Sequence, residues 1–406
     1  MLSNKHKHKE TCWVQRTQNP ESHKTVRRIA LVFLPWKSKT VYKFLNQVVS
    51  ILTPLSTSVT IIGGNTNYLE LKDSVNARAI DVHIKMHDSV DISPLWFGKL
   101  LWAAKAVACE LLEALALVRN TTNIDVVLFY MSYPYDIVPL ITAKLLSKKT
   151  IIVLTRSGRR GKGPLSRFYD AQDALMRATA DVITVESNSL VSELKLSNHS
   201  RKLAVEGYRY IDTKKYCITK NIGQRSKVGF VSRLEAEKGI LNFLQAARLL
   251  SRNYHMSIPF VVAGDGRLRT VVEARVRELK KEGLSIDYTN WIPEDEFCQY
   301  LNELKLLVFP TTVYAEEGLP TIIIEAMACG TPVLTTPVAA IPDVIKDEST
   351  GFLIENTSPE CVAKGIIRAL NFGDLEKVRE QARRVIEDRF SYEDAVRRWE
   401  QILYGA

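Results

Sequence analysis

The chain has 406 residues, of which 46% are hydrophobic and 25% are charged, and its formal net charge is +10. These values are typical of a soluble globular protein and exclude a largely disordered chain. The positive charge predicts attraction to anionic partners, such as nucleotide sugars, phospholipid surfaces or nucleic acid, without choosing among them. At this length we expect about two or three domains, each with its own core.

Residues 1–25 are polar and contain no apolar core of a secretory signal, so we expect them to form a disordered basic tail. No run of about 18 uncharged apolar residues occurs, so no segment is expected to span a bilayer. The six cysteines are scattered and form no CxxC pair, which predicts free thiols in a reducing compartment. Together these features predict a cytoplasmic protein, with attachment to the cytoplasmic face of a membrane left open.

Strand-like and helical segments alternate through the first half of the chain. Apolar, often β-branched runs suited to buried parallel strands occur at residues 28–34, 59–62, 79–86, 125–129, 150–154 and 181–185. Helical spacing separates these runs, and such alternation is typical of a doubly wound α/β domain. We therefore expect residues 26–219 to form one Rossmann-like domain.

One predicted helix in this half has the composition of a membrane-surface helix. In the segment 94–118, Trp96 and Trp102 lie close in sequence to Lys99 and Lys105, as in an interfacial amphipathic helix. The alternative is a packing helix whose lysines reach water along their aliphatic stems. We favour the packing helix, because most amphipathic helices simply face a core.

The alternation starts again after a polar, glycine-containing stretch at residues 217–227, which predicts a linker. Strand-like runs follow at 228–231, 260–263, 285–288, 306–309, 333–335 and 352–354. We expect residues 220–385 to form a second Rossmann-like domain and residues 386–406 a helix that returns to the first. The two domains would face each other across a cleft at the carboxyl ends of their strands, where such folds bind ligands.

Two cations of the second domain lie at the predicted cleft. Arg233 comes just after the strand at 228–231, and Lys238 comes just before the next helix. Together they could neutralise a diphosphate leaving group, which is how electrostatic stabilisation helps a charged product to depart. A solvated charge cluster in an ordinary loop is the alternative.

The most informative stretch is an acidic loop that opens onto a short helix. The strand at 306–309 leads into this loop, and the helix begins near Pro320. Backbone N–H groups at the start of a helix suit a phosphate. Glu317 and Glu325, eight residues apart, suit hydroxyl-rich groups on either side of it. The stretch predicts a ligand that carries both a diphosphate and sugars, although helix capping and an exposed charge could also explain the two glutamates.

These residues resemble the family-4 retaining glycosyltransferases, whose GT-B fold consists of two Rossmann-like domains. The motifs that carry the resemblance are Ser232-Arg233-Leu234 with Lys238-Gly239, Val262-Ala263-Gly264-Asp265-Gly266, Trp291-Ile292-Pro293, Phe309-Pro310-Thr311, and Glu317-x7-Glu325 followed by Ala326-Met327-Ala328-Cys329-Gly330-Thr331-Pro332-Val333. The likeness is strong from about residue 226 to residue 356 and looser from about 124 to 216. Before residue 120 only the general order of strands and helices agrees.

The resemblance implies a role for each of these residues. Glu317 would contact the donor sugar, and Glu325 would bind the ribose hydroxyls. Arg233 and Lys238 would take the place of a metal in stabilising the departing nucleoside diphosphate, so Glu317, Arg233 and Lys238 are the implied catalytic residues. The sugar and diphosphate would be held by backbone amides of the segment Gly318, Leu319, Pro320 and Thr321. The family works without a divalent cation, so neither a metal nor another cofactor is expected.

The first domain departs from the family pattern. Many members carry a cleft histidine after the strand that matches 151–154, but this chain continues there with a basic loop. The loop cations that could bind the phosphate or pyrophosphate of an acceptor, such as a polyprenyl-linked sugar, are Arg156, Arg159, Arg160 and Lys162. A plain solvated surface loop explains the same composition equally well.

The sequence therefore predicts a retaining hexosyltransferase that moves a sugar from a nucleotide-sugar donor to a hydroxyl on a glycan or a lipid-linked acceptor. One alternative is a catalytically silent GT-B subunit that binds a nucleotide sugar, which the missing histidine allows. Another is a nucleic-acid-binding protein, which the net charge allows. The cations are not interleaved with aromatic residues as in a single-strand groove, so we expect no nucleic acid among the partners.

Overall fold

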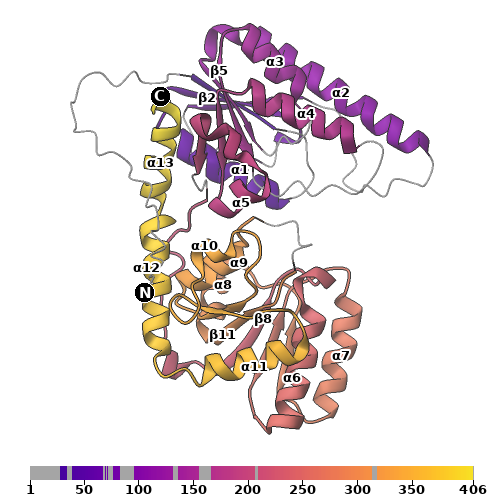
Figure 1. Ribbon diagram of the computed structural model, residues 1–406, viewed down its shortest axis with the longest axis vertical. Coiled ribbons are helices and arrows are strands. Elements are labelled where there is room, and N and C mark those ends of the chain that lie inside the picture. Colours follow the sequence, from indigo (N-terminus) through magenta and orange to yellow (C-terminus); the bar gives the residue numbers. More distant parts are fainter. Residues whose placement is uncertain are drawn as a thin grey trace, which may run out of the picture.

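The computed structural model describes residues 28–33, 39–66, 69, 71, 76–82, 96–130, 136–154, 166–205, 209–312 and 318–405. The side chains of residues 39–41, 96–103 and 166–169 lie outside this description, as does the predicted tail. Two α/β domains lie one above the other (Figure 1), and each is built on a parallel sheet. This confirms the predicted α/β fold with two Rossmann-like domains.

The N-terminal domain contains a seven-stranded sheet of order β3-β2-β1-β4-β5-β6-β7. Its strands are β1 (Arg28–Val32), β2 (Ser58–Gly63), β3 (Ala77–Asp81), β4 (Val126–Tyr130), β5 (Lys149–Leu154), β6 (Val182–Val185) and β7 (Leu203–Val205). From β1 the sheet extends through β2 and β3 on one side and through β4 to β7 on the other. The strand order therefore reverses between the neighbouring strands β1 and β4, which are paired in parallel. Ligands of doubly wound folds bind at the carboxyl ends of strands at such a reversal.

Helices cover both faces of this sheet. They are α1 (Lys39–Leu52), α2 (Trp96–Arg119), α3 (Ile137–Leu145), α4 (Ser166–Thr179) and α5 (Asn188–Glu193), with short 3-10 turns at Thr121–Asn123 and Leu196–Lys202. Ile29 and Leu31 of β1 pack in one core with α1, and Ala30 and Val32 pack in the other with α2 to α5. The alternation of side chains along a strand therefore gives both faces an apolar layer.

The C-terminal domain contains a six-stranded sheet of order β10-β9-β8-β11-β12-β13. Its strands are β8 (Lys227–Val231), β9 (Phe260–Ala263), β10 (Ile286–Thr289), β11 (Leu304–Phe309), β12 (Val333–Thr335) and β13 (Phe352–Leu353). Its helices are α6 (Ile240–Tyr254), α7 (Arg269–Lys281), α8 (Glu294–Glu303), α9 (Thr321–Ala328), α10 (Ile341–Val344), α11 (Pro359–Leu370) and α12 (Leu375–Arg389). The core under α6, α7 and α11 lies on one face of the sheet, and the core under α8, α9 and α12 lies on the other.

The last helix, α13 (Tyr392–Tyr404), lies against the N-terminal domain (Figure 1). Trp399 is fully buried in the core that contains α1. The Tyr392 hydroxyl donates to the Ser50 carbonyl at 2.9 Å, and the Tyr404 hydroxyl donates to the Leu55 carbonyl at 2.8 Å. The end of the chain thus ties the C-terminal domain back to the N-terminal one.

The cysteines of the described residues, Cys109, Cys217, Cys298, Cys329 and Cys361, are all free of disulfides. This agrees with the prediction from their spacing; Cys12 lies outside the described residues. Among the helices that the structure describes, none combines the length and the apolar character that crossing a membrane requires.

Candidate functional site

Two loops meet at the carboxyl edge of the C-terminal sheet. The strand order reverses between the paired strands β8 and β11, so the loops that follow them are neighbours. The loop after β8 contains Arg233 and ends in the 3-10 turn η5 (Ala236–Lys238). The loop after β11 leads to α9, which begins at Thr321. The structure therefore brings the predicted cations and the predicted helix start to the same edge of the sheet.

Close backbone contact holds these two loops together. The Thr312 N–H donates to the Glu237 carbonyl at 2.9 Å. Gly239 has a left-handed backbone with φ +79°, and a Cβ at this position would lie 2.2 Å from the Pro310 carbonyl oxygen. Only glycine allows this approach. The Lys238 side chain is consequently enclosed, with 1% of its surface exposed.

The loop that carries Arg233 rests on the glycine turn after β9. The Leu234 N–H donates to the Asp265 carbonyl at 2.8 Å. Gly264 has φ +138°, and a Cβ there would lie 1.8 Å from the Ser232 carbonyl oxygen. The turn thus positions the loop by direct backbone packing, and the Arg233 side chain stays exposed at its surface.

Glu325 lies buried in α9, with 7% of its surface exposed. Its Oε1 accepts a hydrogen bond from the Tyr216 hydroxyl at 3.3 Å and lies 3.6 Å from Nζ of Lys43, on α1 of the other domain. Burial raises the pKa of the Glu325 carboxyl, and the charge of Lys43 and the Tyr216 hydrogen bond oppose that rise. The alternative of an exposed surface charge is therefore wrong for this residue.

Arg209 links the start of α9 to the N-terminal domain. Its Nε lies 3.0 Å from Oε1 of Glu186, the residue that follows β6. Its Nη1 donates to the Leu319 carbonyl and, at 3.2 Å, to Oγ1 of Thr321. Burial raises the pKa of the Glu186 carboxyl, while Arg209 and the Leu319 N–H lower it. The predicted diphosphate-binding segment is thus held in place by a buried ion pair.

A second contact between the domains involves α10. The Asn188 N–H donates to Oδ2 of Asp343 at 3.0 Å, and the Ser189 hydroxyl donates to Oδ1 at 3.2 Å. Asp343 therefore lies at the amino end of α5, where the helix dipole favours a negative charge. Helices α5 and α10, which follow β6 and β12 at the carboxyl edges of the two sheets, therefore contact each other directly.

Part of the predicted site lies outside the described residues, namely Glu317, Arg156, Arg159, Arg160 and Lys162. The described members of the predicted donor segment all lie at or just before the start of α9, and they are Gly318, Leu319, Pro320 and Thr321. Among the side chains that the structure describes, no cluster of three or more His, Cys, Asp or Glu residues could hold a metal ion. Independence of a metal stays a prediction.

Sequence reasoning missed three residues that surround Glu325 and the start of α9. They are Lys43 of α1, Arg209 in the segment after β7, and Tyr216 just before the predicted linker. No local motif marks them, because their importance comes from contacts between segments that are distant in the sequence. Glu186 lies in the region that resembles the glycosyltransferase family more loosely, but nothing in the sequence indicated that Arg209 is its partner.

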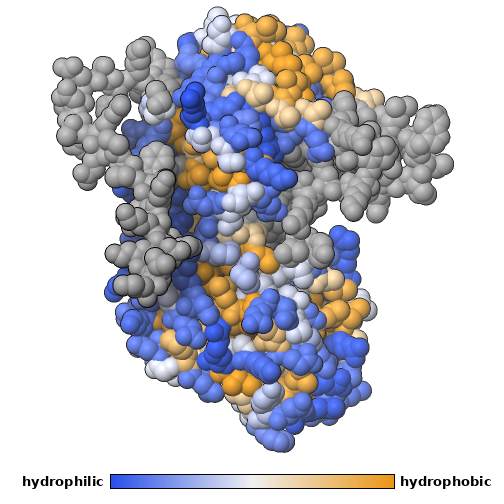
Figure 2. All heavy atoms as spheres, in the orientation of Figure 1, coloured by the Kyte–Doolittle hydropathy of each residue, from blue (hydrophilic) through white to orange (hydrophobic). Residues whose placement is uncertain are grey.

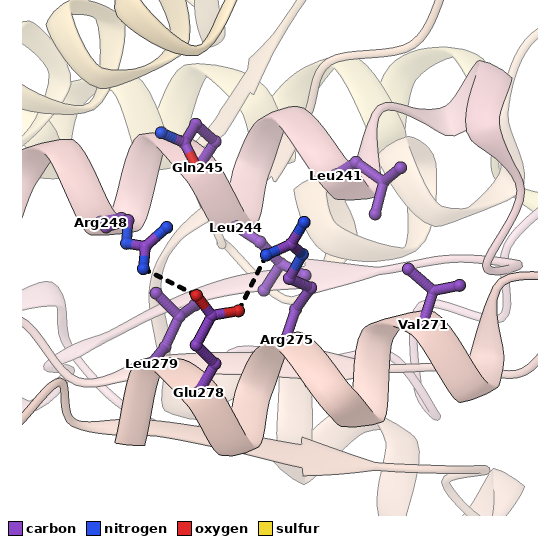
Figure 3. A pocket seen from close by; sticks show the side chains of 8 residues that line it. All are labelled: Leu241, Leu244, Gln245, Arg248, Val271, Arg275, Glu278 and Leu279. Carbon is purple, nitrogen blue, oxygen red and sulfur yellow. Dashed lines mark hydrogen bonds and ion pairs between the residues drawn. The ribbon is translucent and has the colours of Figure 1, made fainter. Parts of the chain in front are cut away.

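A surface groove elsewhere on the C-terminal domain lies between the outer sides of α6 and α7 (Figure 3). Apolar side chains that include Leu241 and Val271 line it. Glu278 accepts hydrogen bonds from Arg248 and Arg275, each at 2.8 Å, so the charges at this groove satisfy one another. The groove is separate from the loops at the carboxyl edge, and no predicted site residue lines it.

Comparisons with known proteins agree with this geometry. Residues 218–386 match the family described as glycosyl transferases group 1. The chain is 25% identical over 285 residues to an uncharacterized glycosyltransferase of Methanocaldococcus jannaschii, covering 65% of this chain and 70% of that protein. It is 24% identical over 313 residues to N-acetyl-alpha-D-glucosaminyl L-malate synthase of Bacillus anthracis, covering 72% of this chain and 78% of that protein.

Among solved structures, Anabaena Alr3699/HepE in complex with UDP has the same fold. The TM-score is 0.72 at 13% identity, and the match covers 93% of this chain and 100% of that one. The two-domain arrangement is therefore that of the GT-B glycosyltransferases.

Proposed function

We propose that the protein moves a hexose-type sugar from a nucleotide-sugar donor to a hydroxyl of a glycan or lipid-linked acceptor, because residues 218–386 match the group 1 glycosyltransferases. In this proposal the sugar keeps its anomeric configuration and no divalent cation is needed. A peripheral position at the cytoplasmic face of a membrane is part of the same proposal.

The observation that carries the proposal is the meeting of the β8 and β11 loops at one edge of the sheet. One loop supplies the cations Arg233 and Lys238, and the other leads into α9, which supplies its amino end and the buried carboxylate of Glu325. Backbone N–H groups at a helix start and two cations suit a diphosphate. A carboxylate that accepts hydrogen bonds suits the hydroxyls of a ribose.

The proposed reaction begins with departure of the nucleoside diphosphate from the sugar. Arg233 and Lys238 stabilise the negative charge that develops on the leaving group, which is where electrostatic stabilisation is most effective. The acceptor hydroxyl then attacks the same face of an oxocarbenium-like sugar and loses its proton to the departing diphosphate. Glu317 contacts the donor sugar, and Glu325 holds the ribose.

The donor class is supported by the solved relative HepE, which contains UDP. Incubation with a panel of UDP-, GDP- and ADP-sugars should release the nucleoside diphosphate from at least one of them, slowly without an acceptor and equally well with EDTA. Loss of release in EDTA would contradict the metal-independent reaction. Thermal stabilisation by a donor without any release would instead identify a silent binding subunit.

For the acceptor we propose that the basic loop binds a phosphate or pyrophosphate. The triple replacement of Arg159, Arg160 and Lys162 by alanine should raise the KM of a polyprenyl-phosphate-linked acceptor, because these cations would contact its phosphate. The KM of the donor should not change. Unchanged kinetics for both substrates would contradict this part of the proposal.

A further inference from the structure

Helix α2 exposes apolar side chains where a surface helix usually carries polar ones. The exposed residues on its outer side are Val107, Leu111, Leu112, Leu115 and Val118, with exposed fractions of 52%, 56%, 40%, 41% and 47%. Positions 107, 111, 115 and 118 follow helical spacing, so these residues form one continuous stripe. Among residues 105–119, the remaining exposed side chain is that of Arg119.

The acidic residues of α2 point inward instead. Glu110 is 5% exposed and its Oε2 accepts the Val138 N–H at 2.9 Å, at the amino end of α3. Glu113 and the neighbouring Asp136 are both fully buried, and burial together with the charge of Asp136 raises the pKa of the Glu113 carboxyl. Burying carboxyl groups opposes folding. Apolar residues such as Cys109 and Leu117 also lie on the inner side, so α2 is apolar on both its inner and its outer sides.

The apolar surface continues onto α3, which packs beside α2 (Figure 1). Ile141 is 40% exposed and Leu145 is 81% exposed. Figure 2 shows the resulting apolar area at the top of the molecule. We call this surface the α2–α3 face; it comprises Val107, Leu111, Leu112, Leu115, Val118, Ile141 and Leu145. Seven of the twelve large exposed hydrophobic residues among the described side chains lie here, so the concentration is not a general property of the surface.

The outward-facing charged side chains on the described parts of α2 and α3 are all positive. Among the described side chains of α2 and α3, Glu110 and Glu113 are the only acids, and both are buried. Lys144 pairs with Asp181 at 2.7 Å. Apart from this pair, the outward charge of the described side chains of the two helices comes from Lys105 and Arg119, which are both positive.

We propose that the α2–α3 face docks on the surface of an anionic lipid bilayer. An apolar stripe flanked by cations matches an interface in which acyl chains lie beneath anionic headgroups. A second copy of the chain fits less well, because a twofold interface would bring Lys105 and Arg119 of both copies to one patch, and the described parts of α2 and α3 expose no acid to match them. The inference deepens the proposed function, since a lipid-linked acceptor would be presented at the same membrane.

Co-sedimentation of the full chain with vesicles tests this docking. Binding to phosphatidylcholine vesicles that contain phosphatidylglycerol should exceed binding to phosphatidylcholine alone, and salt should weaken it. The double variant Leu111→Ser/Leu115→Ser should bind these vesicles at least about tenfold more weakly than the wild type, because it removes two apolar side chains from the contact. Arg119→Ser should reduce the preference for phosphatidylglycerol.

The matched control is Leu241→Ser/Val271→Ser, which changes two similarly exposed residues on α6 and α7. This control should bind vesicles like the wild type. Equal loss in both double variants, or no vesicle binding by the wild type, would overturn the proposal. So would a wild-type dimer in sedimentation velocity that Leu111→Ser/Leu115→Ser converts to a monomer. Release of nucleoside diphosphate in solution is measured separately, so failure of the proposed reaction and failure of docking are distinguishable.

Discussion

Lys43 of α1 and Glu325 of α9 form an ion pair between the two domains, with the lysine Nζ 3.6 Å from the carboxylate Oε1. The lysine side chain is 47% exposed and the glutamate side chain is 9% exposed. In the proposed reaction the same carboxylate accepts hydrogen bonds from the ribose. The Glu325 carboxylate would therefore take part both in donor binding and in the contact between the domains.

Lys43→Ala should weaken donor binding, because the charge of Lys43 opposes the rise in the pKa of Glu325 and favours its ionised form. The pair is partly exposed, so we expect a loss of about 1 kcal/mol at most, which is roughly fivefold in affinity. The loss should grow as the pH falls toward the raised pKa. Calorimetric titration of the donor at two pH values measures this, with the exposed Lys364→Ala on α11 as control. Equal affinities for Lys43→Ala and the wild type at both pH values would contradict the role of the pair.

Alanine substitutions at Gly264 and Gly283 test whether the close backbone contact at Gly264 supports the loop that carries Arg233. Both have positive φ, but a Cβ at 264 would lie 1.8 Å from the Ser232 carbonyl oxygen, whereas a Cβ at 283 would meet nothing within 4 Å. Gly283→Ala should therefore cost only backbone strain, about 1 kcal/mol. Gly264→Ala should cost roughly 3 kcal/mol or more and should slow diphosphate release, because the loop must move. Calorimetric Tm values compare the two, and equal losses of Tm would show that the close approach is unimportant.

Glu113 should make stability depend on pH. Burial first, and then the neighbouring Asp136, raise the pKa of the Glu113 carboxyl well above its usual value. A group whose pKa is raised in the folded state contributes to the free energy of unfolding below its unfolded-state pKa, about 4.3. This contribution is lost as the pH rises through the folded-state pKa. Glu113→Gln removes this titration and keeps the shape. Its Tm should therefore rise relative to the wild type as the pH increases, with the exposed Glu360→Gln as control. A difference in Tm that stays constant with pH would contradict this account.

Most of the fold could be predicted from the sequence, because buried parallel strands are nearly continuous apolar runs. The strand at 333–335, for example, is β12 with the same bounds. The strand β7 was missed, since its three residues are only half-buried and give a weak apolar signal. Glu325 could be identified because it shares a local motif with the helix start. Lys43 and Arg209 could not, because their contacts depend on how the two domains meet.

The orientation of α2 shows a further limit of sequence reasoning. Helical periodicity indicates that the two sides of a helix differ, and we expected the apolar side to face the core. In the structure Glu110 and Glu113 turn inward because α3 begins next to them, with its Val138 N–H bonded to Glu110. Ala116 and Leu117 of α2 do face the core, but the sequence did not indicate that the opposite side of the helix would expose apolar residues as well.

The most direct test of the central claim is the rate of diphosphate release by Lys238→Met, compared with Glu325→Gln. Methionine keeps most of the volume of the enclosed Lys238 side chain and removes only its charge. We predict that Lys238→Met lowers kcat about a hundredfold with little change in donor affinity, because the charge acts on the leaving group. Glu325→Gln should mainly weaken donor binding. A folded Lys238→Met protein that retains the full wild-type kcat would contradict the claim that these two loops bind the departing diphosphate.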